Sequence, residues 1–388
     1  MRPEDILDAS KLCYDGDFNM QIENLLRTVR LTRDQVESLK TLIDDLVWQL
    51  RYCWPDCTAM CFGSIVIGLG IKTSDLDCYI DTHNDEPPKE CVLIARNVMK
   101  HYPNLFRKIF AIKAAKVPIV KFLHVPTSFN CDISFSGPIG VLNSKLMAYL
   151  LQLDNRSIKL ATLVKYWSKV YNFTGTNLMP NYALTILVIF YLQLKGVIPS
   201  ICDLQKNIES DMVNHWNTAF NERWRQPQKC KESLYELLGG FFKYYSKFNF
   251  AEDMVSPFLG QRLKRKAFTK SANVPNEFEV YKSNVDNRIC KALRMDTFMC
   301  VQDTIEHNRN CTVAVYPRLA LRILAHFKYA ADLYDRVGSR EFLKSLLTED
   351  PTPTSTTVAD QTGKIRKIPK NNKGLFKKKF KDLFKTNK

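Results

Sequence analysis

The sequence lacks a hydrophobic run long enough to cross a membrane. Its longest apolar stretch, Tyr182 to Leu194, is shorter and more interrupted than the roughly 20 apolar residues that a membrane-spanning helix needs. The first residues are acidic and have no apolar core, so we expect neither a secretory signal nor a transit peptide. No segment of about 20 to 50 residues recurs, which excludes a solenoid. These absences favour a cytoplasmic globular protein without a transmembrane segment.

The sequence also lacks the close cysteine pairs of a structural zinc site. Its 12 cysteines include Cys53, Cys57 and Cys61, which recur every four residues without a fourth ligand nearby. In a chain without a secretory signal, we expect reduced thiols that belong to the core.

Positive charge is abundant but unevenly distributed. The formal net charge is +16, which favours an anionic partner such as nucleic acid or a membrane surface. Residues 351–388 hold eleven Lys and Arg against two Asp, so +9 of the +16 lies in this tail. Its last residues fit a basic amphipathic helix, and four interpretations stay open: an RNA tether, a membrane-surface helix, a nuclear address or a disordered solubilising end.

The hydrophobic pattern predicts an α+β fold with a mixed sheet followed by a mostly helical part. Helical spacing is present near residues 20–53 and 89–101, and recurs at 142–153, 158–171, 181–194, 233–248 and 318–334. Short apolar runs bounded by turn residues predict strands at 64–67, 75–81, 117–125 and 130–135. We therefore expect N-terminal helices over 1–53 that pack on the helical part, a sheet part over 54–140, a helical part over 141–345 and a basic, disordered tail over 346–388.

Two acidic residues mark the chemistry of the sheet part. Asp75 and Asp77 are two apart on a predicted strand, so their side chains leave the same face. Paired carboxylates suit Mg²⁺ or Mn²⁺, although such a pair alone is equally typical of a solvated turn.

Further residues strengthen this interpretation. Gly63 and Ser64 form a small-residue turn whose N–H groups and hydroxyl could hold phosphates, and Asp132 lies on another predicted strand. Three carboxylates with two metal ions are the equipment for in-line nucleotidyl transfer.

The spacing of Gly63-Ser64, Asp75-x-Asp77 and Asp132 resembles the nucleotidyltransferase signature of the DNA polymerase beta-like superfamily. The segments VKYWSKVY, MPNYALTILVIFYLQ and VQDTIEHNRN are similar to the template-independent RNA terminal nucleotidyltransferases, the group of GLD-type poly(A) polymerases and terminal uridylyltransferases. The resemblance covers roughly residues 20–340 and implies a nucleotidyltransferase catalytic domain at 54–140 and a PAP/25A-associated nucleotide-recognition domain at 141–345, with the active site in the cleft between them.

The resemblance implies metal ligands and a reaction. Asp75, Asp77 and Asp132 would hold Mg²⁺ or Mn²⁺ while an RNA 3′-hydroxyl attacks the α-phosphate of UTP or, as the second choice, ATP. An oligoadenylate synthetase is a third choice. The alternative from another class of protein is a catalytically silent RNA-binding scaffold. The presence of all three acids argues against this alternative.

The resemblance also implies contacts to the sugar and the phosphates. Asn143 and Ser144 match a pair that touches the ribose 2′-hydroxyl, the alternative being a helix N-cap. Lys165 and Lys169 share one helix face and match lysines that grip the triphosphate, the alternative being a solvated face. Asn181 matches a polar residue that contacts phosphate.

The remaining implied contacts concern the base. Tyr182 matches an aromatic residue that stacks on the incoming base, a contact that tolerates any base; the alternative is packing at a helix start. Asp303 and Glu306 match acids that line the base edge, although the family's D-P-F-E reads D-T-I-E here. The position of a discriminating His in uridylyltransferases holds Arg309, with His307 two residues earlier, and an Arg donor favours the acceptor O4 of uracil.

No recognisable RNA-binding module accompanies these motifs. We therefore expect a monomer that takes RNA 3′ ends as substrate and leaves part of the choice of RNA to partner proteins.

Overall fold

Buried hydrophobic side chains form two separate clusters in the computed structural model, which describes residues 6–115, 117–225 and 230–349. The smaller cluster lies under a five-stranded sheet, and the larger one holds the helical part together. Both clusters belong to one compact unit. The predicted α+β fold is confirmed.

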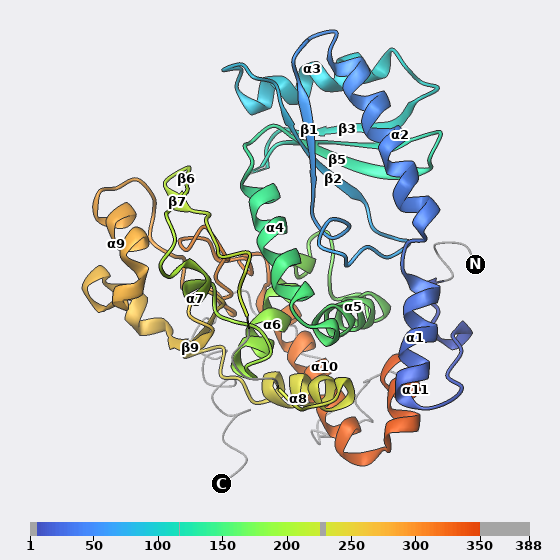
Figure 1. Ribbon diagram of the computed structural model, residues 1–388, viewed down its shortest axis with the longest axis vertical. Helices are drawn as coiled ribbons and strands as arrows, with labels where there is room; N and C mark the ends of the chain where they lie inside the picture. Colours follow the sequence, from blue (N-terminus) through green and yellow to red (C-terminus); the bar gives the residue numbers. More distant parts are fainter. Residues whose placement is uncertain (1–5, 116, 226–229, 350–388) are drawn as a thin grey trace, which may run out of the picture. The chain divides into compact units, whose positions relative to one another are not determined.

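The sheet is mixed and has the strand order β1-β2-β5-β4-β3, in which only β2 and β5 are parallel (Figure 1). Its strands are β1 (Thr58–Phe62), β2 (Leu76–Asp81), β3 (Phe106–Ile112), β4 (Ile119–His124) and β5 (Phe129–Ser134).

Two helices, α2 (Arg33–Leu50) and α3 (Pro88–Lys100), cover one face of the sheet. Alternate strand residues such as Cys78, Val120 and Ile133 point into this covered face. Because side chains alternate along a strand, their neighbours Asp77, Lys121 and Asp132 point to the opposite, open face.

Several details of the sheet differ from the predictions. Residues 64–67 are a turn after β1 and not a strand, and neither β1 nor β3 was predicted. The expectation that both N-terminal helices pack on the helical part is wrong for α2, because Leu39, Leu42 and Leu46 lie in the cluster under the sheet. Helix α1 (Phe18–Val29) does lie in the larger cluster.

The helical part surrounds a central helix, α6 (Asn181–Leu194). The longer helices are α4 (Ile139–Gln152), α5 (Asn155–Val170), α8 (Leu234–Ser246), α10 (Pro317–Arg336) and α11 (Ser339–Thr348). Shorter elements are α7 (Ile201–Gln205), α9 (Glu279–Asp286), the ribbons β6 (Met212–Val213) with β7 (Trp216–Asn217) and β8 (Asp253–Ser256) with β9 (Gln261–Lys264), and the 3-10 turns η2 (Ala9–Lys11), η3 (Arg265–Thr269), η4 (Ser271–Asn273) and η5 (Asn276–Phe278). The hydrophobic pattern does not predict the two ribbons.

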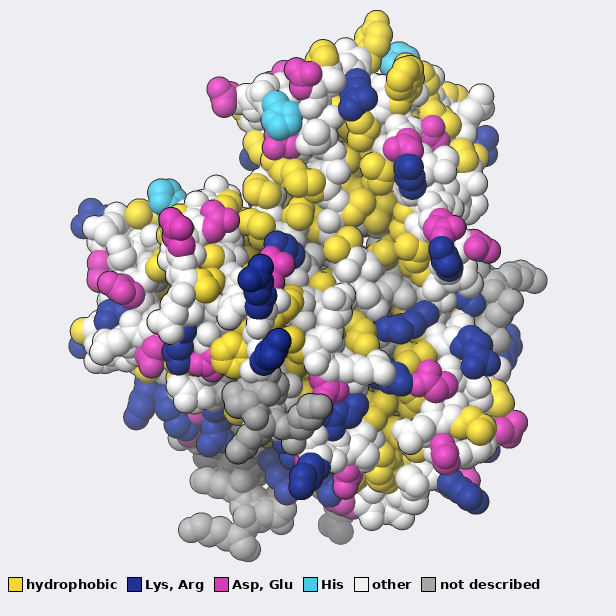
Figure 2. All heavy atoms as spheres, in the orientation of Figure 1, with side chains coloured by type: hydrophobic (Ala, Val, Ile, Leu, Met, Phe, Trp, Pro, Cys, Tyr) yellow, Lys and Arg dark blue, Asp and Glu magenta, His cyan; other side chains and the backbone are white. Residues whose placement is uncertain are grey.

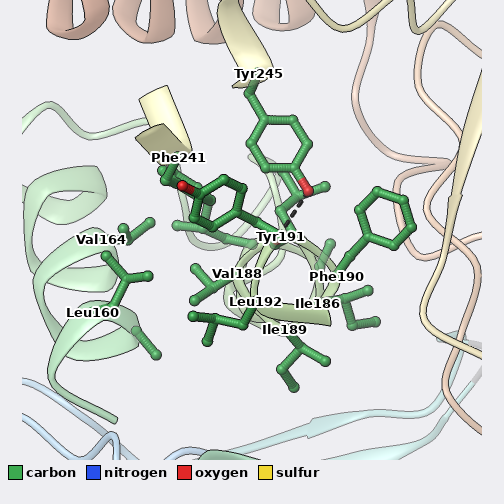
Figure 3. Packing of buried hydrophobic residues seen from close by; sticks show 14 of the residues in the cluster. Leu160, Val164, Ile186, Val188, Ile189, Phe190, Tyr191, Leu192, Phe241 and Tyr245 are labelled. Atoms are coloured by element: carbon green, nitrogen blue, oxygen red, sulfur yellow. Dashed lines mark hydrogen bonds between the residues drawn. The ribbon is translucent and has the colours of Figure 1, made fainter. Parts of the chain in front are cut away.

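The apolar run of α6 is explained by burial on all sides (Figure 3). Tyr191 packs edge-on against Phe241 of α8, and the Tyr245 hydroxyl donates a hydrogen bond to the carbonyl of Leu187 at 2.7 Å. Within the part of the chain that the structure describes, no helix is both long and apolar enough to cross a bilayer.

Charged side chains are scattered on the face seen in Figure 2, where Lys and Arg do not gather in one patch. Hydrophobic side chains gather instead on the upper part, which holds the sheet. The basic tail predicted for residues 346–388 lies outside the described residues from Asp350 onward.

Candidate active site

Three carboxylates meet on the open face of the sheet. Asp77 of β2 and Asp132 of β5 are direct partners in the parallel register, and Asp75 immediately precedes β2. Lys121 of β4 lies opposite Asp132, with its Nζ 2.5 Å from Asp132 Oδ2 and 4.0 Å from Asp75 Oδ2. The predicted acids are therefore neighbours, and a lysine that the sequence reasoning missed joins them.

The three carboxylates lie close enough together to disfavour one another's ionisation. Burial, followed by the neighbouring Asp132 and Asp75 carboxylates, raises the pKa of Asp77 to about 7. Burial also raises the pKa of Asp132, against the opposing effect of Lys121. A cation placed among these oxygens would be stabilised, because the opposing effect of Lys121 and Lys165 does not offset burial and the neighbouring carboxylates at Asp77.

The donor set fits a hard divalent cation, since carboxylate oxygens are what Mg²⁺ and Mn²⁺ prefer. In the described ranges, however, no three Asp, Glu, His or Cys side chains are arranged as a ready metal site. Lys121 neutralises Asp132 in this arrangement. The metal therefore stays a prediction that rests on the chemistry of the donors.

A glycine turn brings the chain close to the acids. Gly63 has φ +79°, and a Cβ at this position would lie only 2.1 Å from Asp77 Oδ2, so a larger residue would displace that carboxylate. The Gly63 N–H donates to Ser144 Oγ of α4 at 2.8 Å, and the Ser144 hydroxyl donates to the Gly140 carbonyl at 2.8 Å. Ser64 follows in the turn and its carbonyl accepts from the Leu69 N–H at 2.8 Å.

Helix α5 directs two lysines toward the acids. Lys165 is only 4% exposed, and its Nζ donates to the Leu69 carbonyl at 2.8 Å and to Ser74 Oγ at 3.0 Å. Burial and the nearby Lys169 lower the pKa of Lys165 to about 7, and burial also lowers the pKa of Lys169. A solvated lysine face is therefore wrong for Lys165, which is held beside the residues that lead into β2.

A second cluster forms around Asp303, in the segment before α10. Asp303 is fully buried, and its Oδ1 accepts from the N–H groups of Ile305 and Glu306, each at 3.0 Å. Arg309 Nη1 lies 3.6 Å from Asp303 Oδ2 and 3.2 Å from Glu306 Oε2. Burial alone would lower the pKa of Arg309, but the Asp303 carboxylate raises it overall, so Arg309 stays charged.

Hydrogen bonds join this cluster to α4 and α6. The Tyr182 hydroxyl lies 3.1 Å from Thr304 Oγ1, and the Thr304 hydroxyl donates to Asn143 Oδ1. Asn143 Nδ2 lies 3.4 Å from Asp303 Oδ1. Because Ser144 contacts Gly63 and Asn143 contacts this cluster, α4 connects the two halves of the candidate site.

Asn181, at the start of α6, has a buried Oδ1 without a hydrogen-bond partner among the described residues. A buried polar atom without a partner costs free energy unless a ligand or water supplies one. Because Oδ1 and phosphate oxygens are both acceptors, this atom needs a donor such as water or a hydroxyl, and the contact to phosphate stays a prediction that rests on the Asn181 Nδ2 donor.

His307 does not belong to the candidate site. It is 7% exposed and packs among the rings of Trp216, Phe258 and Phe278, with centroid distances of 5.6, 4.3 and 5.3 Å. Burial lowers its pKa to about 4, so the ring is neutral at pH 7.

Sequence reasoning missed three residues of this arrangement, Lys121, Ser74 and Thr304. Lys121 left one signal, a single charge in the apolar strand IVKFLH. The two hydroxyl residues left none, because their partners are distant in the sequence.

Residues 18–152 match the family model of the central palm domain of mitochondrial-like poly(A) RNA polymerase. We refer to these residues as the palm. The match contains β1 to β5 and all three carboxylates.

The palm and the helical part after it are similar to known terminal nucleotidyltransferases, which confirms the resemblance seen in the sequence. The speckle targeted PIP5K1A-regulated poly(A) polymerase of Danio rerio is 28% identical over 67% of this chain and 39% of its own length. Terminal uridylyltransferase 7 of Homo sapiens is 29% identical over 53% of this chain and 15% of its own length. The chain thus spans well under half the length of these relatives.

Solved structures share the fold beyond the palm. The crystal structure of mtPAP in complex with ATPgammaS superimposes on 89% of this chain and 74% of its own with a TM-score of 0.74 at 20% identity. The Cid1 poly(U) polymerase superimposes on 85% of this chain and 97% of its own with a TM-score of 0.66, also at 20% identity.

Proposed function

We propose that this protein adds ribonucleotides to RNA 3′ ends without a template. The observation that carries the proposal is the meeting of Asp75, Asp77 and Asp132 on one sheet face, with Gly63 against Asp77 and the buried Lys165 nearby. The relatives named as poly(A) polymerases and terminal uridylyltransferases support the same reaction.

Asp75, Asp77 and Asp132 would hold Mg²⁺ or Mn²⁺. The chemistry that such a cation would supply there is activation of the 3′-hydroxyl and stabilisation of the leaving pyrophosphate. In the proposed reaction the 3′-oxygen forms a bond to the α-phosphorus, the bond to the pyrophosphate breaks, and Asp132 would help to remove the hydroxyl proton.

The palm turn and helix α5 bind the triphosphate in this proposal. Lys165 and Lys169 supply the positive charge, and Asn181 supplies an amide. Asn143 and Ser144 remain the proposed contacts to the ribose, although the Ser144 hydroxyl proton is already donated to Gly140.

UTP is the proposed substrate, and ATP is the second candidate. Tyr182 would stack on either base. The guanidinium of Arg309 is oriented by Asp303 and Glu306 and donates only, so it suits uracil O4 and opposes the adenine amino group. This pair of acids is the observation that favours UTP.

We also propose that the protein acts as a cytoplasmic monomer, that partner proteins contribute to the choice of RNA, and that the basic tail from residue 351 binds an anionic partner. A nuclear location is the alternative that the tail offers.

One assay tests the proposed function. Purified full-length protein is given a labelled RNA and each of the four ribonucleoside triphosphates separately, with Mg²⁺ or Mn²⁺. The variant that carries Asp75→Ala and Asp77→Ala should extend nothing, while the control Asp81→Ala, further along β2, should extend RNA as wild type does. If the wild type extends no RNA under any of these conditions, the protein is not the proposed enzyme.

A further inference from the structure

The three acids are part of a longer row of side chains across the open face of the sheet. The strand register aligns Phe62 with Asp77, Asp77 with Asp132, Asp132 with Lys121, and Lys121 with Phe110. Directly aligned residues of neighbouring strands point to the same face. The row therefore runs from β1 through the candidate active site and ends at Phe110 on β3.

Phe110 is exposed in a way that a packing role does not explain. Its side chain is 64% exposed, and Ile112, two residues further along β3, is 40% exposed. Strand β3 packs against β4 and, on the covered side, against α3. Exposed aromatic and aliphatic side chains that lie together indicate a binding surface rather than scattered surface residues.

A β-bulge gives Phe110 its direction. Between Arg107 and Phe110 the β3 strand has two residues opposite one of β4, and the first of them, Lys108, has φ +51°. A positive φ is uncommon for lysine, and bulges often reorient a side chain next to an active site. Without the extra residue, the alternation along β3 would direct Phe110 to the face covered by α3.

The surroundings of Phe110 are basic. Arg107, Lys108 and Lys113 are exposed on β3 or directly after it, and Lys121 lies between Phe110 and Asp132. An exposed ring with a basic border is the combination that binds single-stranded nucleic acid, because bases stack on the ring while cations meet the phosphates.

We propose that Phe110 stacks on a base of the RNA substrate a few nucleotides upstream of the 3′ end. Phe110 is two strands away from Asp132, about 10 Å at the usual strand spacing, which corresponds to about three stacked nucleotides. The RNA strand thus crosses the open face of the sheet from Asp132 toward the edge strand β3. The inference rests on the proposed function, because the RNA 3′ end at Asp132 brings the strand to this edge.

Binding of RNA without triphosphate tests the platform independently of the reaction. The probe is a dye-labelled single-stranded RNA of about a dozen nucleotides, and binding is followed by fluorescence anisotropy with the full-length protein. Phe110→Ala and Phe110→Leu should each raise the Kd about tenfold, because neither side chain stacks, whereas Phe110→Tyr should bind as wild type. The matched control is Trp48→Ala, since Trp48 is a 73% exposed aromatic residue on α2.

Extension of acceptors of different lengths gives the second measurement. Phe110→Ala should raise the KM for the long RNA about tenfold, and should leave the KM for a dinucleotide acceptor unchanged, because a dinucleotide is too short to reach β3. The KM for the triphosphate should not change.

The outcomes separate this inference from the proposed function. Equal RNA binding by wild type, Phe110→Ala and Phe110→Leu overturns the platform, as does a wild type that binds no RNA. A change of oligomeric state in Phe110→Ala, with RNA binding unchanged, also overturns it and assigns the surface to a second copy of the chain. If Phe110→Leu weakens RNA binding but the wild type extends no RNA, the platform is supported and the proposed function fails.

Discussion

The two halves of the candidate site differ in how far their carboxylates are neutralised by neighbouring groups. In the palm, Asp75 is 43% exposed, and burial together with the neighbouring carboxylates raises the pKa of Asp77 to about 7. In the cluster near α10, Asp303 is fully buried, accepts two backbone N–H groups and faces Arg309. The palm acids are therefore available to a cation from outside, whereas Asp303 is already satisfied and holds a neighbouring side chain in place.

This comparison predicts that replacing Asp77 and replacing Asp303 have different effects on activity and stability. Asp77→Asn should lower kcat at least about a thousandfold, because metal-assisted charge stabilisation is worth several kcal/mol. Its unfolding free energy should stay equal or rise, since the repulsion from Asp75 and Asp132 is reduced. Steady-state kinetics and urea unfolding of Asp77→Asn and of the control Asp81→Asn check both parts. A variant that is inactive because it is unfolded would contradict the comparison.

Asp303→Ala should affect mainly the stability of the protein. It leaves Arg309 without its buried partner and two N–H groups without an acceptor, so the unfolding free energy should fall by about 3 kcal/mol. Urea unfolding measures this loss. Glu306→Ala is the control, because Glu306 is less buried and pairs with the same arginine. An Asp303→Ala protein as stable as wild type would show that Asp303 has no structural role.

His307 should make the stability of the helical part depend on pH. Its pKa is about 4 in the folded protein and about 6.5 when exposed, so the unfolded chain binds more protons between these values. Stability should therefore fall as the pH decreases through this window, by about 2 kcal/mol between pH 6.5 and pH 5. Unfolding of wild type and His307→Phe at several pH values measures the difference; parallel pH profiles would contradict the prediction.

The smallest expected effect concerns Lys165. Lys165→Met should raise the KM for the triphosphate about tenfold, the worth of one charge-assisted hydrogen bond, and should leave the protein at least as stable because a buried charge is removed. The control Lys159→Met, on the same helix, should change neither quantity by more than a small amount. An unchanged KM would show that Lys165 does not bind the triphosphate and serves only to connect Leu69 and Ser74.

Much of the palm could be predicted from local patterns. The strands that carry Asp77 and Asp132 are predictable because turn residues bound their short apolar runs, and acids two apart on a strand share a face. The failures are also local in origin. Residues 64–67 are apolar enough to suggest a strand but form a turn, and β3 escapes prediction because its bulge and exposed residues interrupt the alternation.

Hydrophobic periodicity and residue type are properties of short segments, and they suffice to predict the α+β composition, the palm acids and the helix with Lys165 and Lys169. Four other features became visible through the tertiary structure alone: Lys121 lies beside Asp132, Lys165 is buried, His307 is turned away from the site, and Phe110 lies at the end of the row of side chains that contains Asp77 and Asp132. Strand order and register create these neighbours, and both depend on contacts between residues far apart in the chain, which no local pattern contains.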